Sequence, residues 1–233
     1  MREINKVVSV KQLAIQTAGT LVVFIVTLFL PAGTLAWPAA WLFLALMFGF
    51  TLAVGWWLLR FNPDLLAERM TGIGKPDQKS WDKVLLVITA IAFFAWLVLM
   101  GLDAVRFRWS QVPLWLQALG TLLLLSSFYV FYLTFRENPF LSPAVRIQRE
   151  RAQTVVSTGP YRYVRHPMYS GFILFAFGTA LLLGSSWGMA GALLLIGIVA
   201  RRAVLEERTL RDELEGYSVY LTRVRYRLLP YLW

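Results

Sequence analysis

Residues 168–200, MYSGFILFAFGTALLL-GSS-WGMAGALLLIGIVA, form two apolar runs joined by three small residues. A link as short as Gly184-Ser185-Ser186 leaves room only for a tight turn between antiparallel helices. The flanking runs, Met168–Leu183 and Trp187–Ala200, contain no charged residue. The stretch therefore predicts a tight and strongly apolar helical hairpin.

Four longer apolar runs precede this hairpin. The whole chain is 58% hydrophobic and 15% charged, with a mean hydropathy of +0.60, which is too apolar for a soluble domain of 233 residues. Most runs approach the roughly 20 residues that cross a hydrocarbon core about 30 Å thick. We therefore expect an all-α integral membrane protein with about six transmembrane helices. Their expected ranges are Leu13–Leu30, Trp41–Leu59, Val84–Val105, Leu114–Phe135, Met168–Leu183 and Trp187–Ala200.

Basic residues lie in alternate connectors. The N-terminus, residues 60–83, residues 136–165 and the chain after residue 200 together hold 21 of the 23 lysines and arginines. By the positive-inside rule, these segments and both termini are cytoplasmic, as in a multi-pass protein of a bacterial inner membrane. The first apolar run follows Arg2 and Lys6 as a signal peptide would, but it lacks a convincing cleavage site. We interpret it as a retained span.

The composition also excludes several kinds of functional site. The chain has no cysteine and one histidine, which excludes disulfides, thiolate nucleophiles and multi-histidine metal sites, so we expect no metal. The net charge of +10 suits contact with anionic inner-leaflet lipid, and we expect no nucleic acid partner. We divide the chain into a four-helix membrane anchor, residues 1–135 with a cytoplasmic connector at 60–83, and a catalytic and cofactor-binding region, residues 136–233.

Any nucleotide-like cofactor would need an unusual site, because no Rossmann or Walker pattern is present. The thirty-residue connector 136–165 is long enough to be functional. Within it, Gln153-Thr154-Val155-Val156 has an extended pattern and leads into a Gly-Pro turn. We therefore expect a cytoplasmic cofactor pocket formed by this connector and by the helix that follows the hairpin.

The stretch Gly159–Tyr169, GPYRYVRHPMY, contains the single histidine. Pro167 keeps His166 out of helical geometry and suits the first turn of the next helix. Arg165, His166 and Tyr169 should therefore gather where that helix begins. Two interpretations are open: an interfacial belt at the level of the lipid headgroups, or one wall of a pocket.

Arg202 and Glu206 lie just beyond the last apolar run. On a continuing helix they are four residues apart and share a face. They could form an exposed ion pair worth about 0.3–0.5 kcal/mol, or they could line a pocket opposite His166. The basic and aromatic tail, residues 217–230, could lie on the anionic leaflet or cover a cofactor.

These residues together resemble a known family. Gly-Pro-Tyr-Arg-x-Val-Arg-His-Pro-x-Tyr-x-Gly at 159–171, followed by Glu206-Glu207 and Tyr217-x-x-Tyr220, is similar to the isoprenylcysteine carboxyl methyltransferases and their phospholipid methyltransferase relatives. The upstream segments 60–69, 81–83 and 145–148 resemble bacterial members. The resemblance implies a membrane methyltransferase that uses S-adenosyl-L-methionine, releases S-adenosyl-L-homocysteine and takes a lipid-like substrate from the bilayer.

The resemblance also implies roles for individual residues. Glu206 would bind the cofactor's amino group or a ribose hydroxyl, and Arg202 would face the substrate, so both count as catalytic candidates. The other expected cofactor contacts are Gln153, Thr154, Val155, Val156, Tyr161, Arg165, His166, Pro167, Met168 and Tyr169.

Several activities fit these features. The leading expectation is carboxyl O-methylation of an isoprenylcysteine-type substrate, whose ionised carboxylate needs no general base. A phospholipid amine or a small thiol would need a proton removed, for which His166 or a tyrosine is the candidate. Membrane sterol reductases, which use NADPH, share a similar Arg-His-Pro-x-Tyr region but are usually longer. A scaffold or transporter would place paired charges inside the spans, which are almost free of them.

Overall fold

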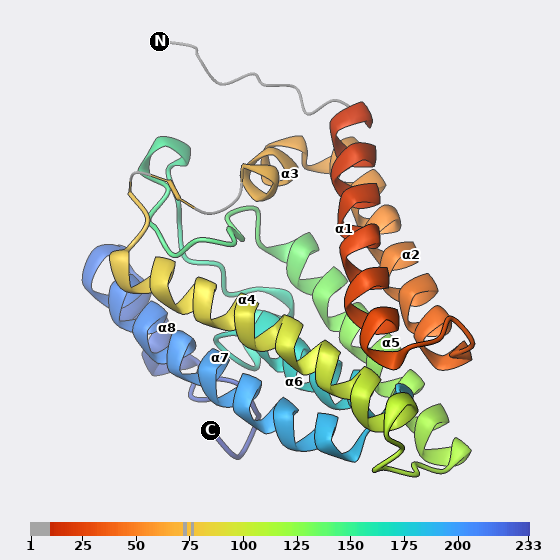
Figure 1. Ribbon diagram of the computed structural model, residues 1–233. Coiled ribbons are helices and arrows are strands. Elements are labelled where there is room, and N and C mark those ends of the chain that lie inside the picture. Colours follow the sequence, from red (N-terminus) through yellow and green to blue (C-terminus); the bar gives the residue numbers. More distant parts are fainter. Residues whose placement is uncertain (1–9, 72–73, 76) are drawn as a thin grey trace.

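The computed structural model describes residues 10–71, 74–75 and 77–233, and this part of the chain contains helices and no strand. Arg2 and Lys6 lie outside the described residues. The two short helices are α3 (Pro63–Met70) and α8 (Tyr217–Arg223), and a π-helical turn covers Leu102–Arg106. The long helices are α1 (Val10–Ala32), α2 (Pro38–Phe61), α4 (Ser80–Gly101), α5 (Leu114–Glu137), α6 (Pro167–Leu182) and α7 (Ser186–Glu213) (Figure 1).

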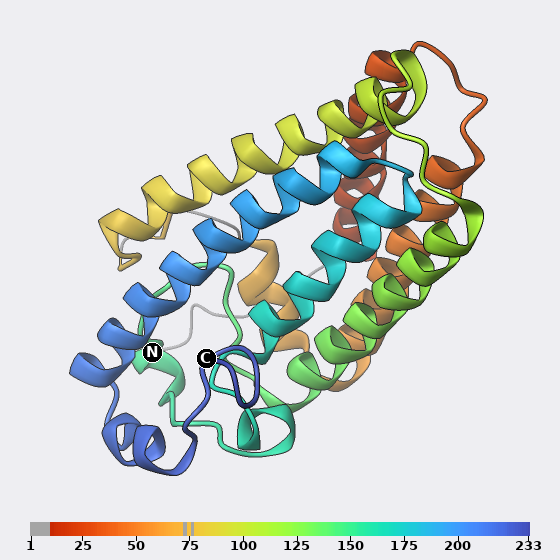
Figure 2. The same ribbon diagram turned by 90° about the horizontal axis from the view of Figure 1, so that it is seen from below.

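The six long helices pack in a closed order. Seen from below, α4, α7, α6 and α5 lie side by side (Figure 2), and α1 and α2 complete the ring by packing against α4 and α5. The centre is filled by large apolar side chains with almost no exposure, because a helix that is apolar all round must bury part of its surface against neighbours. They are Leu28, Phe43, Leu97, Met100, Leu124 and Leu195.

The all-α membrane architecture is confirmed. Among the described residues, five helices are long and apolar enough to cross a membrane. The fifth expected span, α6, has only 16 residues, fewer than the roughly 20 that a perpendicular crossing requires. Helix α7, which contains the sixth expected span, is instead longer than its apolar run. Because α7 continues past Ala200 to Glu213, Arg202 and Glu206 stand on the same rigid element as the hairpin.

The tight hairpin is also confirmed. Helix α6 ends at Leu182 and α7 begins at Ser186. Gly184 has a φ of +79°, and the Gly184 and Ser185 N–H groups donate to the carbonyls of Leu181 and Ala180. This is a Schellman ending, in which glycine takes the left-handed position. The Ser185 side chain then caps α7 by accepting from the Gly188 N–H at 2.7 Å.

Glycines allow α5 and α6 to approach closely. A Cβ on Gly178 would lie 2.6 Å from the Leu124 nitrogen and 2.9 Å from the Gly120 carbonyl oxygen. Both are backbone atoms, which cannot move aside as a flexible side chain could. This contact fixes α6, whose first turn carries Tyr169.

We expect Gly178→Ala to lower the free energy of unfolding by about 1–3 kcal/mol, because the added methyl would overpack the helix contact. Gly197→Ala on α7 is the matched control, since its Cβ would meet nothing within 4 Å and should leave stability unchanged or slightly higher. Thermal unfolding of both variants in detergent measures the difference. Equal stability of the two variants would contradict this packing.

Candidate active site

A cavity of about 320 Å³ lies where α6 begins, within the roughly 300–1,000 Å³ range of small-molecule sites. Its walls come from α3, α4, the connector after α5, the first turn of α6, α7 and α8. The structure thus brings together residues from the expected membrane anchor, 1–135, and from the expected catalytic region, 136–233. The boundary between these two regions stays a prediction. All twelve site residues predicted from the sequence line this cavity: Gln153, Thr154, Val155, Val156, Tyr161, Arg165, His166, Pro167, Met168, Tyr169, Arg202 and Glu206.

One wall is fixed by the turn at Gly159. This glycine has a φ of +54°, which favours glycine, and a Cβ there would lie 2.3 Å from Glu137 Cγ and would displace that side chain. The turn places Tyr161 in a buried position. The Tyr161 hydroxyl accepts from Asn138 Nδ2 at 2.8 Å, and its carbonyl accepts from the Tyr220 hydroxyl at 2.7 Å. Burial raises the pKa of Tyr161, so its phenol stays protonated at neutral pH.

The chain near the C-terminus pairs with the histidine turn. The N–H groups of Arg165 and His166 donate to the carbonyls of Tyr226 and Arg227 at 2.9 and 3.0 Å. Tyr217 and Tyr220 are buried and line the cavity. The tail therefore forms part of the cavity wall. Its basic composition alone would have suggested only contact with the membrane surface.

Glu207 holds this tail in place, and sequence reasoning gave it no role. Its carboxylate accepts two hydrogen bonds from Arg227, at 3.0 and 2.8 Å, and lies 3.2 Å from Arg165 Nε. The adjacent residue Glu206 points elsewhere, because successive residues of a helix are about 100° apart. The Glu206-Glu207 pair was visible in the sequence. Only the tertiary fold shows that Glu207 contacts the tail while Glu206 contacts Tyr169.

Arg202 has a different partner from the one that helix spacing suggested. Its Nε donates to Asp82 Oδ1 at 2.8 Å, and Asp82 has 0% exposure. The other nitrogens donate to the Tyr169 hydroxyl at 2.9 Å and to the Pro143 carbonyl at 2.7 Å. The interpretation as an exposed Arg202–Glu206 pair is therefore wrong.

Tyr169 links Arg202 to Glu206. The Tyr169 hydroxyl donates to Glu206 Oε2 at 2.5 Å while it accepts from Arg202. The ring of His166 stacks on the Tyr169 ring, with centroids 5.5 Å apart. A single polar chain thus runs along the cavity. It joins Asp82 of α4, Arg202 and Glu206 of α7, and Tyr169 in the first turn of α6. An interfacial belt facing lipid does not describe this arrangement.

Three buried polar atoms of cavity residues lack a hydrogen bond within the described chain: Arg165 Nε, His166 Nε2 and Tyr217 Oη. Two of these atoms face a carboxylate, since Arg165 Nε lies 3.2 Å and His166 Nε2 lies 3.8 Å from Glu207 Oε2. Buried polar groups are nearly always satisfied, so the Tyr217 hydroxyl is a candidate ligand contact. Together with the half-buried Glu206 carboxylate, this set offers donors and acceptors of both charge signs. It fits a zwitterionic ligand such as the amino-acid part of S-adenosyl-L-methionine, which has an ammonium and a carboxylate.

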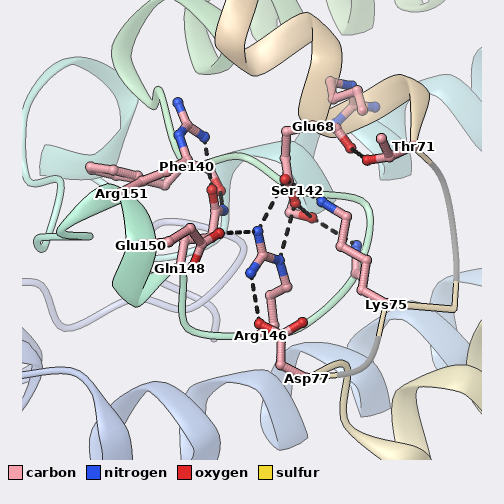
Figure 3. A network of polar contacts seen from close by, with 12 residues as sticks. Glu68, Thr71, Lys75, Asp77, Phe140, Ser142, Arg146, Gln148, Glu150 and Arg151 are labelled. Atoms are coloured by element: carbon pink, nitrogen blue, oxygen red, sulfur yellow. Dashed lines mark hydrogen bonds and ion pairs between the residues drawn. The ribbon is translucent and has the colours of Figure 1, made fainter. Parts of the chain in front are cut away.

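A second polar network lies beside the cavity and fixes α3 (Figure 3). Asn62 caps α3 by accepting from the Leu65 N–H at 3.2 Å, as its Asn-Pro start predicts. The Glu68 carboxylate then accepts from Arg146 at 3.2 and 3.1 Å, from Ser142 at 2.7 Å, and from Lys75. These bonds join α3 to the connector that forms one cavity wall.

The Glu68 network predicts an acid-sensitive stability. Burial raises the pKa of Glu68, but hydrogen bonds from Arg146, Lys75 and Ser142 outweigh it and lower this pKa from 4.5 to about 2. The contribution to stability is therefore complete above pH 4.5 and is lost as the pH falls from 4.5 toward 2. Thermal unfolding between pH 7 and pH 2 should show this loss in the wild type and a shallower slope in Glu68→Gln.

The control for this pH dependence is Asp64→Asn, which changes an exposed carboxylate on the same helix. It should keep the wild-type slope. Equal slopes in the wild type and Glu68→Gln would show that Glu68 does not carry the acid sensitivity.

The bundle and its cavity define a multi-pass membrane protein with a partly open site, lined by polar side chains, at one end. Within it, residues 115–214 match the family model described as Phospholipid methyltransferase. This match confirms the resemblance found in the sequence, and the family implies methyltransferase activity. The matched residues extend from α5 to the end of α7 and include all twelve predicted site residues. The comparison with curated proteins gives no match.

Proposed function

We propose that this protein transfers a methyl group from S-adenosyl-L-methionine to a lipophilic acceptor, most similar to carboxyl O-methylation of an isoprenylcysteine-type substrate. The observation that supports this most is the single cavity that gathers every predicted cofactor contact within the family-matched residues. The distribution of basic residues supports a cytoplasmic location for this cavity, with both termini cytoplasmic in a bacterial inner membrane.

The cavity residues have chemistry that suits the cofactor. Glu206 would bind the ammonium or a ribose hydroxyl, and Arg165, whose Nε faces Glu207, would bind the carboxylate through its terminal nitrogens. The aromatic faces of Tyr161 and Tyr169 favour a nearby cation. When bound, the cofactor supplies an electrophilic methyl on a sulfonium. The protein's contribution is then to align the acceptor and to exclude water, which matters most for an in-line displacement.

A carboxylate acceptor requires no proton transfer. Its oxygen forms the bond to the methyl carbon while the sulfur–carbon bond breaks and leaves its electron pair on sulfur. The description of the matched family supports a phospholipid as the alternative acceptor, which would be methylated on its amine. An amine must lose a proton, and His166, whose Nε2 lies 3.8 Å from Glu207 Oε2, would be the base in that case. A small-thiol acceptor makes the same demand. The NADPH-dependent reductase and the non-catalytic scaffold are alternatives of other classes.

Methyl transfer by the full chain in nanodiscs tests the proposal. The chain is incubated with tritium-methyl S-adenosyl-L-methionine and with N-acetyl-S-farnesylcysteine, phosphatidylethanolamine or dodecanethiol. We expect base-labile label on the farnesylated carboxylate, as a methyl ester gives. Base-stable label on the phospholipid would move the assignment to N-methylation. No label on any acceptor or on total bacterial lipid would count against methyl transfer.

A further inference from the structure

Four arginines line the cavity, and three of them have carboxylate partners. Arg146 pairs with Glu68, Asp77 and Glu150. Arg165 lies 3.2 Å from Glu207, and Arg202 lies 2.8 Å from Asp82. Each of these three side chains therefore has at least one carboxylate partner within the protein. The fourth is Arg69.

Arg69 is a half-buried cation with no carboxylate partner among the described residues. Its Nη1 donates to the Leu141 carbonyl at 3.2 Å, and its guanidinium lies 4.7 Å from the centroid of the Phe135 ring. Within the described chain no carboxylate lies within 4.0 Å of it. A guanidinium has five N–H donors, so most of its capacity is unused. Burial lowers the pKa of Arg69 to about 10, which still leaves it charged at neutral pH.

The surroundings of Arg69 are apolar. Phe135 belongs to a buried cluster with Val54 and Leu58 of α2, and Leu141 and Met168 pack against this cluster. Leu141 and Met168 also line the cavity. Arg69 therefore lies on the side of the cavity that continues into the apolar contact of α2 and α5.

We propose that Arg69 binds the anionic group of the methyl acceptor, a carboxylate or a lipid phosphate, while the hydrocarbon chain lies against the apolar side. This inference rests on the proposed function and names the residue that selects the substrate. An uncompensated guanidinium with free donors suits a planar carboxylate or a phosphate. Arg202, which the resemblance assigned to the substrate, has its donors occupied by Asp82, Tyr169 and Pro143 and acts as a positioning residue.

The network around Glu68 gives Arg69 a fixed position. Glu68 is the preceding residue on α3, and its bonds to Arg146 and Ser142 hold this helix against the connector (Figure 3). Asn62 caps the start of α3 and the bonds of Glu68 hold its end. A binding side chain on such a fixed helix loses little conformational freedom when its ligand binds. The arrangement therefore presents the Arg69 guanidinium to the cavity without a large rearrangement.

Arg69→Gln tests this inference in the full chain in detergent, with Arg60→Gln as the matched control. Arg60 is exposed at the end of α2, so Arg60→Gln removes an equal charge near the same membrane face. The first readout is stabilisation by S-adenosyl-L-homocysteine, which reports the cofactor site. The second is further stabilisation, with that product saturating, by N-acetyl-S-farnesylcysteine, its carboxamide, or a short-chain phosphatidic acid. The third is the KM of the labelled acceptor.

We expect all three proteins to respond equally to S-adenosyl-L-homocysteine. At least one anionic probe should stabilise the wild type and Arg60→Gln but not Arg69→Gln, and the carboxamide should stabilise none. The acceptor KM should rise about 10- to 100-fold in Arg69→Gln, as expected for a lost hydrogen bond to a charged group, with a smaller rise in Arg69→Lys. Which probe acts distinguishes a carboxylate from a phosphate.

Three results would overturn the inference and leave the proposed function standing. The first is equal stabilisation of Arg69→Gln and the wild type by the anionic probes. The second is no effect of any anionic probe on a wild type that binds S-adenosyl-L-homocysteine. The third is a loss of product binding in Arg69→Gln and Arg69→Lys with an unchanged acceptor KM, which would place Arg69 at the cofactor. A wild type that does not bind S-adenosyl-L-homocysteine would instead contradict the proposed function itself.

Discussion

Arg202→Ala should lower the free energy of unfolding by about 3–5 kcal/mol, because it leaves the Asp82 carboxylate buried without its partner. Asp82 has 0% exposure, and its remaining bonds come from Gln78 Nε2 and the Val145 N–H, which carry no full positive charge. The same change removes a donor to Tyr169 and so should also reduce turnover. Thermal unfolding in detergent and labelled methyl transfer measure the two effects.

The neighbouring Arg201→Ala is the control for Arg202→Ala, because Arg201 is exposed on the same turn of α7. It should leave stability within about 0.5 kcal/mol of the wild type. In the double variant Asp82→Asn/Arg202→Met no unpaired charge is buried, so part of the lost stability should return. Equal stability of Arg201→Ala and Arg202→Ala would show that the buried pair does not hold the bundle together.

Glu206→Gln should weaken binding of S-adenosyl-L-homocysteine at least tenfold while the fold is retained. The amide keeps the shape of the side chain and can still accept from the Tyr169 hydroxyl, but it has no charge for the ligand's ammonium. Loss of one charge-assisted hydrogen bond corresponds to about 1.5–3 kcal/mol, or roughly 10- to 100-fold in affinity. Isothermal titration in detergent measures the binding constant.

Glu215→Gln provides the matched control for Glu206→Gln, since Glu215 is exposed beyond the end of α7. Its affinity for the product should equal that of the wild type. An unchanged affinity in Glu206→Gln would remove Glu206 from the cofactor site and leave it only as the acceptor for Tyr169.

Local signals made much of the fold predictable. The apolar runs gave the spans, the Gly184 link gave the hairpin, and Pro167 marked the start of α6 within one residue of the expectation. These features depend on neighbours in the sequence, such as a proline at a first turn or a glycine at a left-handed position. The same local reasoning brought the connector and the Arg202 region to one cavity, since both were placed on the same side of the membrane.

Long-range partners could not be predicted. Asp82 and Arg202 are 120 positions apart, and helix spacing suggested the nearer Glu206 instead. Arg69 stood within a segment that resembled bacterial members, yet nothing in its neighbours showed that it would lack an acid in the folded protein. The helix period places a residue on a face, but only packing decides which other face it meets. The same limit applied to Glu207.

Direct binding of S-adenosyl-L-homocysteine by the full chain in detergent tests the central claim, that the cavity between α6, α7 and the connector holds the methyl donor. Titration calorimetry with this product and, separately, with NADPH is the measurement. We predict saturable one-to-one binding of S-adenosyl-L-homocysteine, weakened in Glu206→Gln, and no binding of NADPH. Binding of NADPH alone would contradict the account and favour a reductase.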